Sequence, residues 1–194
     1  QDAAELRTSF IEALVTGLSM DDEGFLQAAL KDRSQVVRAA AVDALARLPQ
    51  SQLVARMRER ADACLTHKTG LLRSSSLDVK LPGEYAPAWK DEGVLLDAPA
   101  EFVSQRLPGL KTKIGPRAWW LFQFVSAVPP AHWTQQFGID AQALVRLAAK
   151  TEWNEALLGA WQLAALRHAD EQWQQALLEV WAQRLQSEDA HAYT

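Results

Sequence analysis

Residues 31–49 read KDRSQVVRAAAVDALARLP, and this stretch decides the fold class that the sequence predicts. Its apolar residues recur at spacings of three and four, which predicts a helix with one wide apolar face. Much of that face is alanine, so a neighbouring helix can approach it closely. Asp32, followed three residues later by Gln35, predicts a capping box at the start of the helix, and Pro49 predicts its end.

The same stretch resembles the second half of a HEAT repeat. It carries Asp32, then Arg38 six positions later, and then the small apolar positions of the alanine-rich face. In that family, an aspartate and an arginine at this spacing tie the turn between two helices to the second helix. The resemblance therefore implies a structural role for Asp32 and Arg38, with residues 22–30 as the first helix of the repeat. The alternative is an ordinary amphipathic helix that follows a turn.

Two further helices are expected beside this repeat. Residues 2–18 place a large apolar side chain at every fourth position, and residues 51–65 carry a second apolar stripe with arginines on the other sides. A few stacked helices bury little apolar surface by themselves. We therefore expect them to pack against further elements of the chain.

Residues 66–113 have a different character, with several prolines, a run of serines and no sustained helical period. Residues 77–81 alternate apolar and polar side chains, which predicts a short strand, and we expect residues 93–96 to pair with it. Tyr85 and Trp89 indicate that the insert packs down on the helices. Two roles remain open for it: a brace across the helices or a binding loop.

From residue 114 onward the chain is predicted to be helical again. Pro116 is placed to begin a helix, and residues 118–125 (AWWLFQFV) are apolar nearly all round, so that helix is expected to be buried. A short helix over 131–137 and another over 141–150 follow. Asp140 is expected to cap the second of these.

An internal repeat marks the C-terminal part. The pattern W-x-x-A-L-L-x-x-W occurs at residues 153–161 and again at residues 173–181. On a helix, both tryptophans of each copy lie on the same face as the leucine midway between them. Two consecutive helices with the same stripe predict an αα-hairpin, with Thr151 as the cap of its first helix.

Length and composition favour a folded domain of ordinary size. The chain has 194 residues, is 48% hydrophobic and carries a net charge of -4. We expect one continuous domain in three parts, over residues 1–65, 66–113 and 114–194. No apolar run approaches the roughly 20 residues that a membrane span needs. The single cysteine fits a reducing compartment, so a cytoplasmic location is expected.

The N-terminal residues lack both a methionine and a signal-peptide pattern, so we expect a fragment of a longer protein.

Charge is distributed unevenly along the chain. Residues 1–30 hold one arginine against six acids, residues 31–80 hold ten basic residues against five acids, and residues 140–194 hold four against eight. The basic middle predicts a candidate interaction surface. Its candidate residues are Arg38, Arg56, Arg60 and Arg73. The alternative is that arginine-rich helices have solvated faces and no ligand.

Motifs for catalysis are absent from the sequence. It has no glycine-rich phosphate loop, no G-x-S-x-G nucleophile turn and no H-E-x-x-H zinc pair. One cysteine and four scattered histidines do not make a cysteine-rich zinc site. His132 and His168 are interpreted as helix-terminal residues. We therefore expect no catalytic residue, no cofactor and no metal.

Taken with residues 80–85 (KLPGEY), residues 115–133 and the tryptophan hairpin, the chain resembles an uncharacterised bacterial family of HEAT-like helical-repeat proteins. The resemblance implies an all-α fold, a HEAT-like α-α superhelix or right-handed solenoid, with an irregular insert that holds a short β segment. It implies no reaction.

We expect a non-catalytic scaffold or adaptor that binds another protein. The alternative is a HEAT-like nucleic-acid binder that uses residues 31–80, and an enzyme of unrecognised type is a distant third.

Overall fold

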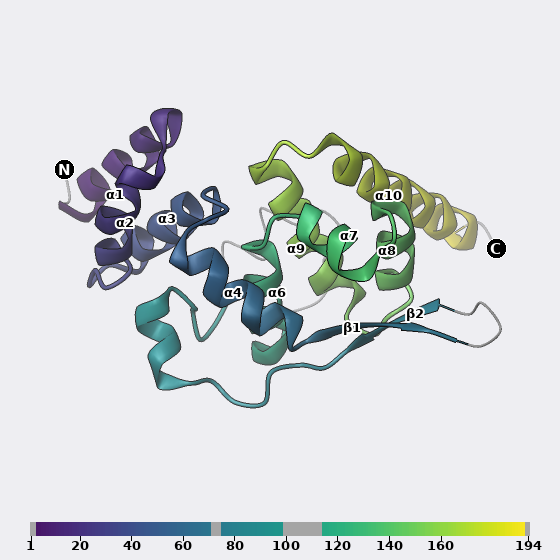
Figure 1. The fold of residues 1–194 in the computed structure, drawn as a ribbon. Helices are drawn as coiled ribbons and strands as arrows, with labels where there is room; N and C mark the ends of the chain where they lie inside the picture. The colour runs from purple at the N-terminus through teal and green to yellow at the C-terminus, as the bar shows by residue number, and fades with distance from the viewer. Residues whose placement is uncertain (1–2, 71–74, 99–113, 193–194) are drawn as a thin grey trace.

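The computed structural model describes residues 3–70, 75–98 and 114–192 (Figure 1). The fold is mostly helical, with one small two-stranded sheet. The helices are α1 (Ala3–Leu14), α2 (Glu23–Ala29), α3 (Gln35–Ala46), α4 (Gln52–Asp62), α6 (Pro116–Ser126), α7 (Ala131–Phe137), α8 (Ala141–Ala148), α9 (Asn154–Arg167) and α10 (Glu171–Ala192). The strands are β1 (Leu65–Thr69) and β2 (Ser75–Val79), and the short 3₁₀ helices are η1 (Val15–Gly17), η2 (Met20–Asp22) and η3 (Pro87–Glu92).

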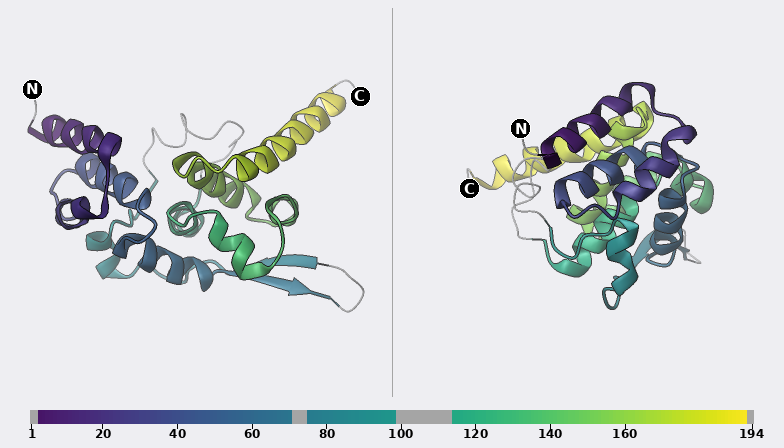
Figure 2. Two further views of the ribbon diagram at one scale, coloured as in Figure 1. Left: turned by 45° about the horizontal axis from the view of Figure 1, so that its top comes forward. Right: turned by 90° about the vertical axis from the view of Figure 1, so that its left-hand side faces the viewer.

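The helices pack in a series from one end of the molecule to the other. Helices α1 and α2 both contact α3, α3 contacts α4, α4 contacts α6, and α6 contacts α9. Helices α8 and α9 then pack against α10. Figure 2 shows α1 and α10 at opposite ends, with the β1–β2 hairpin projecting from the end of α4. The expectation of a mostly helical chain with a short β segment is confirmed.

Helix α3 forms the centre of the N-terminal part. Its apolar face is fully buried at Val37, Ala41, Ala44 and Leu45, and α1 and α2 lie against it. The predicted capping box is wrong, because Ser34 is the N-cap and Gln35 is the first residue of the helix. The Asp32 carboxylate instead accepts a hydrogen bond from the Ser34 backbone, one turn before the helix starts.

The β-hairpin corrects two predictions. The helix expected over residues 51–65 ends at Asp62, and Leu65 begins β1, which pairs antiparallel with β2. The partner of β2 is therefore β1, and residues 93–96 do not pair with it. Short apolar runs suit a helix end and a strand equally well, so local sequence did not separate the two.

The described part of the insert lies against the helices. The Tyr85 hydroxyl donates to the Val94 carbonyl at 2.6 Å. The Gln123 side chain of α6 accepts from the Leu95 backbone N–H at 2.7 Å and donates to the Leu95 carbonyl at 2.9 Å. These bonds use the backbone that we had expected to pair with β2. Residues 99–113 lie outside the described residues.

Gly93 allows the insert to enter a tight space between helices. Its backbone is left-handed, at φ 89°, and a Cβ atom there would lie 2.7 Å from Cγ2 of Val42. Leu30 and Leu53 would each lie 3.2 Å from the same atom. Glycine is the residue that fits both the backbone angle and the space.

Large aromatic side chains fill the C-terminal core. Trp133, Trp161 and Trp173 are fully buried, with ring centroids 6.4 Å apart for the first pair and 5.0 Å apart for the second. The predicted tryptophan hairpin is confirmed as α9 and α10. The predicted cap is wrong, because Thr151 donates to the Ala148 carbonyl and α9 begins only at Asn154.

Candidate interaction surface

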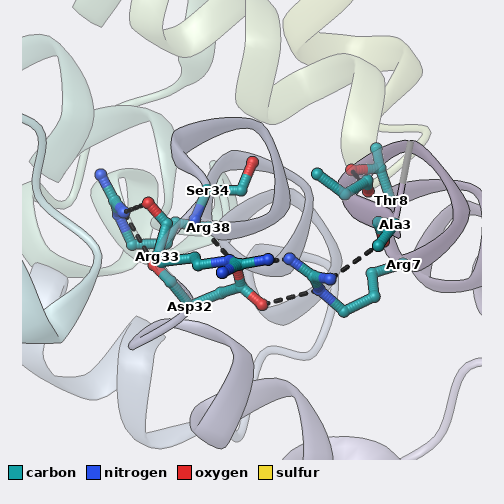
Figure 3. Close-up of polar contacts among 8 residues, drawn as sticks. Ala3, Arg7, Thr8, Asp32, Arg33, Ser34 and Arg38 are labelled. Atoms are coloured by element: carbon teal, nitrogen blue, oxygen red, sulfur yellow. Dashed lines mark hydrogen bonds and ion pairs between the residues drawn. The ribbon is translucent and has the colours of Figure 1, made fainter.

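The side chains of Asp32 and Arg38 both serve the turn between α2 and α3 (Figure 3). The Arg38 guanidinium donates to the Asp32 backbone carbonyl at 2.7 Å and to the Arg33 carbonyl at 3.2 Å. The Asp32 carboxylate accepts two hydrogen bonds from Arg7 of α1, at 2.8 and 3.0 Å. This arrangement links the turn to α3 on one side and to α1 on the other.

The electrostatics of Asp32 agree with a structural role. Its pKa is lowered, first by the hydrogen bond from the Arg7 side chain and then by the bond from the Ser34 backbone, while burial acts in the opposite direction. A carboxylate held in the charged form is a poor general acid or base near neutral pH. The Asp32 carboxylate therefore stabilises the turn through its bonds to Ser34 and Arg7.

Arg56 connects α4 to α2. Its Nη2 atom donates to the Gln27 side-chain oxygen at 3.1 Å. Its Nε atom is buried without a hydrogen-bond partner among the described residues. Burial lowers the pKa of Arg56, and the nearby Glu92 carboxylate opposes that effect.

Arg60 lies between α4 and the insert. Its guanidinium lies 5.3 Å from the ring centroid of Trp89 and 5.8 Å from that of Phe124, and it forms an ion pair with Glu92. Only 18% of the Arg60 side chain is exposed. Cation–π contacts of this kind are stronger where water is excluded. The insert therefore covers this arginine.

The four predicted surface arginines are not all available to a partner. Arg38 bonds to backbone carbonyls, Arg56 to a glutamine and Arg60 to Glu92. Glu92 lies close to Arg56 and Arg60 of α4. Arg73 lies outside the described residues. Arg38, Arg56 and Arg60 therefore join parts of the protein to one another.

A surface that the sequence analysis missed lies on α1 and α2. Leu6, Phe10 and Phe25 are 60%, 55% and 49% exposed, and the two phenylalanine rings meet edge to face at 5.7 Å. The four-residue spacing of Leu6 and Phe10 suggested a buried stripe. In the structure Ile11 is the buried residue of α1, while Arg7 bonds to Asp32.

We call the cluster of Leu6, Phe10 and Phe25 the α1–α2 face, and exposed acidic side chains lie in the same part of the chain. Glu5 and Glu12 of α1 and Asp21 of η2 are exposed, and the one arginine of residues 1–30, Arg7, is bonded to Asp32. Two features of the sequence could have indicated the α1–α2 face: the charge imbalance of residues 1–30 and the presence of Phe25. By itself, the imbalance indicated only that the middle of the chain is basic.

A second polar cluster joins α3 to α9. Asp43 forms an ion pair with Arg47 at 3.1 Å, and its other oxygen pairs with Arg167 at 2.9 Å. Arg167 also donates to the Ser126 carbonyl at 2.7 Å. The pKa of Asp43 is lowered because the two arginines outweigh burial. The cluster fixes the packing of α9 against α3 and α6.

Next to that cluster, burial lowers the pKa of His168, and Arg167 and Arg47 lower it further. His132 at the start of α7 bonds to Asp62 at 2.7 Å. Both histidines lie at helix ends, as the sequence predicted.

The remaining reactive group is the Cys64 thiol, which is buried. Burial raises its pKa to about 11, and a thiol that stays protonated at neutral pH is a poor nucleophile. No group of three histidine, cysteine, aspartate or glutamate side chains is placed to hold a metal ion in residues 3–70, 75–98 and 114–192. Among those residues, no helix has the length and apolar character that crossing a membrane requires.

The comparisons with known proteins give one result. Neither the curated proteins nor the solved structures include a match to this chain. A model of a protein family does match, and it covers residues 1–194, the whole of the chain. Because the match spans the full length, the chain belongs to the family of unknown function DUF5691.

Proposed function

We propose that the protein is a scaffold or adaptor that binds another protein through the α1–α2 face, and that its helices form a HEAT-like right-handed solenoid. The solenoid proposal is supported by the Asp32–Arg38 contact in the turn and by the series in which neighbouring helices pack. We further propose a bacterial, cytoplasmic protein, in keeping with a free cysteine and with the family resemblance.

The observation that carries the proposal is the exposure of Leu6, Phe10 and Phe25 together. Apolar surface costs roughly 25 cal/mol for each Å² left in water. Single exposed apolar residues are common, but a contiguous cluster bordered by polar groups marks an interaction site. The exposed carboxylates in the same part of the chain favour a partner with a basic, amphipathic segment.

Nucleic acid is less well supported as the ligand. Phosphate contact needs several free arginines or lysines on one face, and Arg38, Arg56 and Arg60 already have partners within the protein. Stacking on bases needs exposed aromatic rings, and Trp161 and Trp173 are buried in the core. The exposed aromatic cluster lies instead in an acidic part of the chain, and acids repel phosphate.

A matched pair of double variants tests the proposal. Leu6→Ser with Phe10→Ser removes apolar surface from the α1–α2 face, and Leu166→Ser with Leu178→Ser removes similarly exposed leucines at the other end of the chain. Partners are recovered from native lysate after nuclease treatment and quantified by mass spectrometry. We expect the wild type and the control variant to capture the same partner proteins in equal amounts. The α1–α2 variant should recover about tenfold less of these proteins, or lower still.

Equal recovery with all three proteins would show that the α1–α2 face is not the binding site. Loss of every captured protein after nuclease treatment would support the nucleic-acid alternative. Circular dichroism and thermal melting of each variant show whether a loss of binding comes from unfolding. All four substituted side chains are largely exposed, so the variants are expected to fold.

A further inference from the structure

The edge of strand β2 that faces away from β1 lies beside a groove, and α8, which contacts β2, forms part of the opposite wall. The groove, about 270 Å³ in volume, is lined by residues 75–79 and by Leu147, Lys150, Thr151, Glu152 and Trp153. All five residues of β2 line it, and none of β1 does. We call this the β2 groove. Since the lining residues of β2 alternate between the two faces of the sheet, the groove follows the edge of the strand.

The strand register shows which backbone groups point into the groove. The Lys80 N–H donates to the Cys64 carbonyl at 2.8 Å, so this opposed pair is a hydrogen-bonded one. Hydrogen-bonded and non-bonded pairs alternate along an antiparallel ladder. The pairs Val79–Leu65, Leu77–His67 and Ser75–Thr69 are therefore non-bonded.

It follows that the N–H and C=O groups of Ser75, Leu77 and Val79 point away from β1. No hydrogen bond to these six backbone groups is found among the described residues. A two-stranded sheet is marginally stable, and an exposed edge is a template for one more strand. The backbone chemistry of the edge thus selects an extended peptide.

The floor and ends of the groove add selectivity. Leu77, Leu147 and Trp153 form a partly apolar floor that suits one apolar side chain of an added strand. Among the charged groups beside the edge, Asp78 is paired with Lys68 at 2.9 Å, and the groove is lined by one further base, Lys150, and one further acid, Glu152. The edge itself therefore has no strong preference for charge.

Lys150 also lines a second groove, of about 390 Å³, between α8 and α10. The other lining residues include Arg146 and Arg184, and no acidic residue takes part. Arg184 donates to the Asn154 side chain at 2.8 Å and stacks on Trp181. Residues 140–194 have four basic residues in all, and three of them line this groove. Arg146 and Lys150 lie at the C-terminal end of α8, where basic residues stabilise the helix dipole. That explanation does not cover Arg184, because Arg184 belongs to α10.

We infer that the free edge of β2 binds an extended segment of a partner protein, and that acidic residues following this segment lie over Lys150 and Arg146. The segment adds a third, hydrogen-bonded strand to the sheet. The inference rests on the proposed role in protein binding, and it names a second surface, separate from the α1–α2 face.

The test starts from a phage-displayed library of random peptides, selected on the unaltered chain. Selected peptides are synthesised, and their affinity is measured by fluorescence anisotropy. We expect enrichment of peptides with an extended apolar–polar alternation next to acidic residues. In hydrogen-exchange NMR of the unaltered chain, bound peptide should slow the exchange of the Ser75, Leu77 and Val79 amides.

A pair of proline variants separates the two edges of the hairpin. Ser75→Pro removes an outward N–H from β2, and Thr69→Pro removes the opposed outward N–H from β1. We expect Ser75→Pro to weaken peptide binding by about tenfold and Thr69→Pro by less than about twofold. Lys150→Glu, which leaves the hairpin intact, should weaken the binding of acidic peptides by about tenfold.

Three results would each overturn the inference. The first is a library that yields no binder, the second is unchanged exchange at all three outward amides, and the third is equal affinity for Ser75→Pro and Thr69→Pro. A dimer in sedimentation that Ser75→Pro converts to monomer would assign the edge to a second copy of this chain and also overturn it. Binding at the α1–α2 face is measured by different variants, so failure here leaves that proposal standing.

Discussion

The N-terminal helices α1 to α4 and the C-terminal helices α6 to α10 are stabilised in different ways. Around α3 the packing uses small side chains, and polar contacts such as Asp32 with Arg7 hold the helices in register. In the C-terminal part, tryptophan rings fill the core. The first region depends on directional bonds at fixed positions, and the second on the area of large rings.

The difference between the two regions shows which packing contacts can be predicted from a local sequence pattern. Several polar contacts of the first region act at short range, over two to six positions along the chain, while those of Arg7 with Asp32 and Arg56 with Gln27 join segments far apart along the chain. The ring contacts of the second region join helices that are distant in sequence, as Trp133 does with Trp161. A local pattern therefore predicts the first region in more detail than the second.

The largest effect is expected from Trp161→Ala in the C-terminal core. The Trp161 side chain is fully buried, so its removal should lower the free energy of unfolding by about 3–5 kcal/mol. Trp161→Phe should cost much less, since it keeps an aromatic ring and removes an indole N–H that has no partner among the described residues. Urea unfolding followed by circular dichroism measures both. An equal loss of unfolding free energy in the two variants would contradict the conclusion that buried ring area stabilises this core.

Gly93→Ala tests the insert that joins the two regions. The left-handed backbone and the short distance to Val42 should together cost about 2 kcal/mol or more. Gly83→Ala is the matched control, because no atom lies within 4 Å of the Cβ position there. We expect the control to stay within about 0.5 kcal/mol of the wild type in the same urea titration. A Gly93→Ala protein as stable as the control would show that the insert backbone can shift at residue 93 to accommodate a Cβ atom.

Asp32→Asn tests the polar contacts of the N-terminal region by their pH dependence. The folded pKa of Asp32 is below its unfolded value, so its carboxylate stabilises the fold above that unfolded value, about 3.9. This contribution is lost as the pH falls through the folded pKa. Thermal melting should therefore show a lower midpoint for Asp32→Asn at pH 7 and no difference in strong acid. A difference that persists in strong acid would rule out the charge as its cause.

The smallest effect is expected at His168, where the two regions meet. Its folded pKa is lowered by burial and by Arg167 and Arg47, so the unfolded chain binds the proton more readily. Stability is then complete above the unfolded pKa, about 6.5, and declines as the pH falls below it. His168→Asn should flatten this decline between pH 7.5 and pH 5, measured by urea unfolding at each pH. An unchanged slope would show that another group is responsible.

The sequence predicted most of the helices because their apolar periods are local. It also predicted the Asp140 helix cap and the tryptophan hairpin, where the signal lies in a few adjacent residues. It failed at β1, because Leu65 follows a helical stripe without a break and only its partner Val79 makes it a strand. Partners far along the chain leave no mark on a local pattern.

The candidate surface was harder to predict. Charge counting selected Arg38, Arg56 and Arg60, but whether an arginine is free depends on the residues that approach it in space, such as Glu92 and Gln27. The apolar spacing of α1 gave a helix and did not show which side faces α3. Exposure of Phe10 follows from the direction in which α1 docks.

Taken by itself, the sequence determined a mostly helical chain, the small-residue face of α3, the turn contact of Asp32 with Arg38 and a family of unknown function. The first three depend on residues within a few positions of one another, and the family on the pattern of the whole chain. Only the tertiary structure decided that the arginines are occupied, that an apolar cluster faces solvent and that β2 keeps a free edge. These features arise from contacts between distant segments, and burial is a property of the assembled fold.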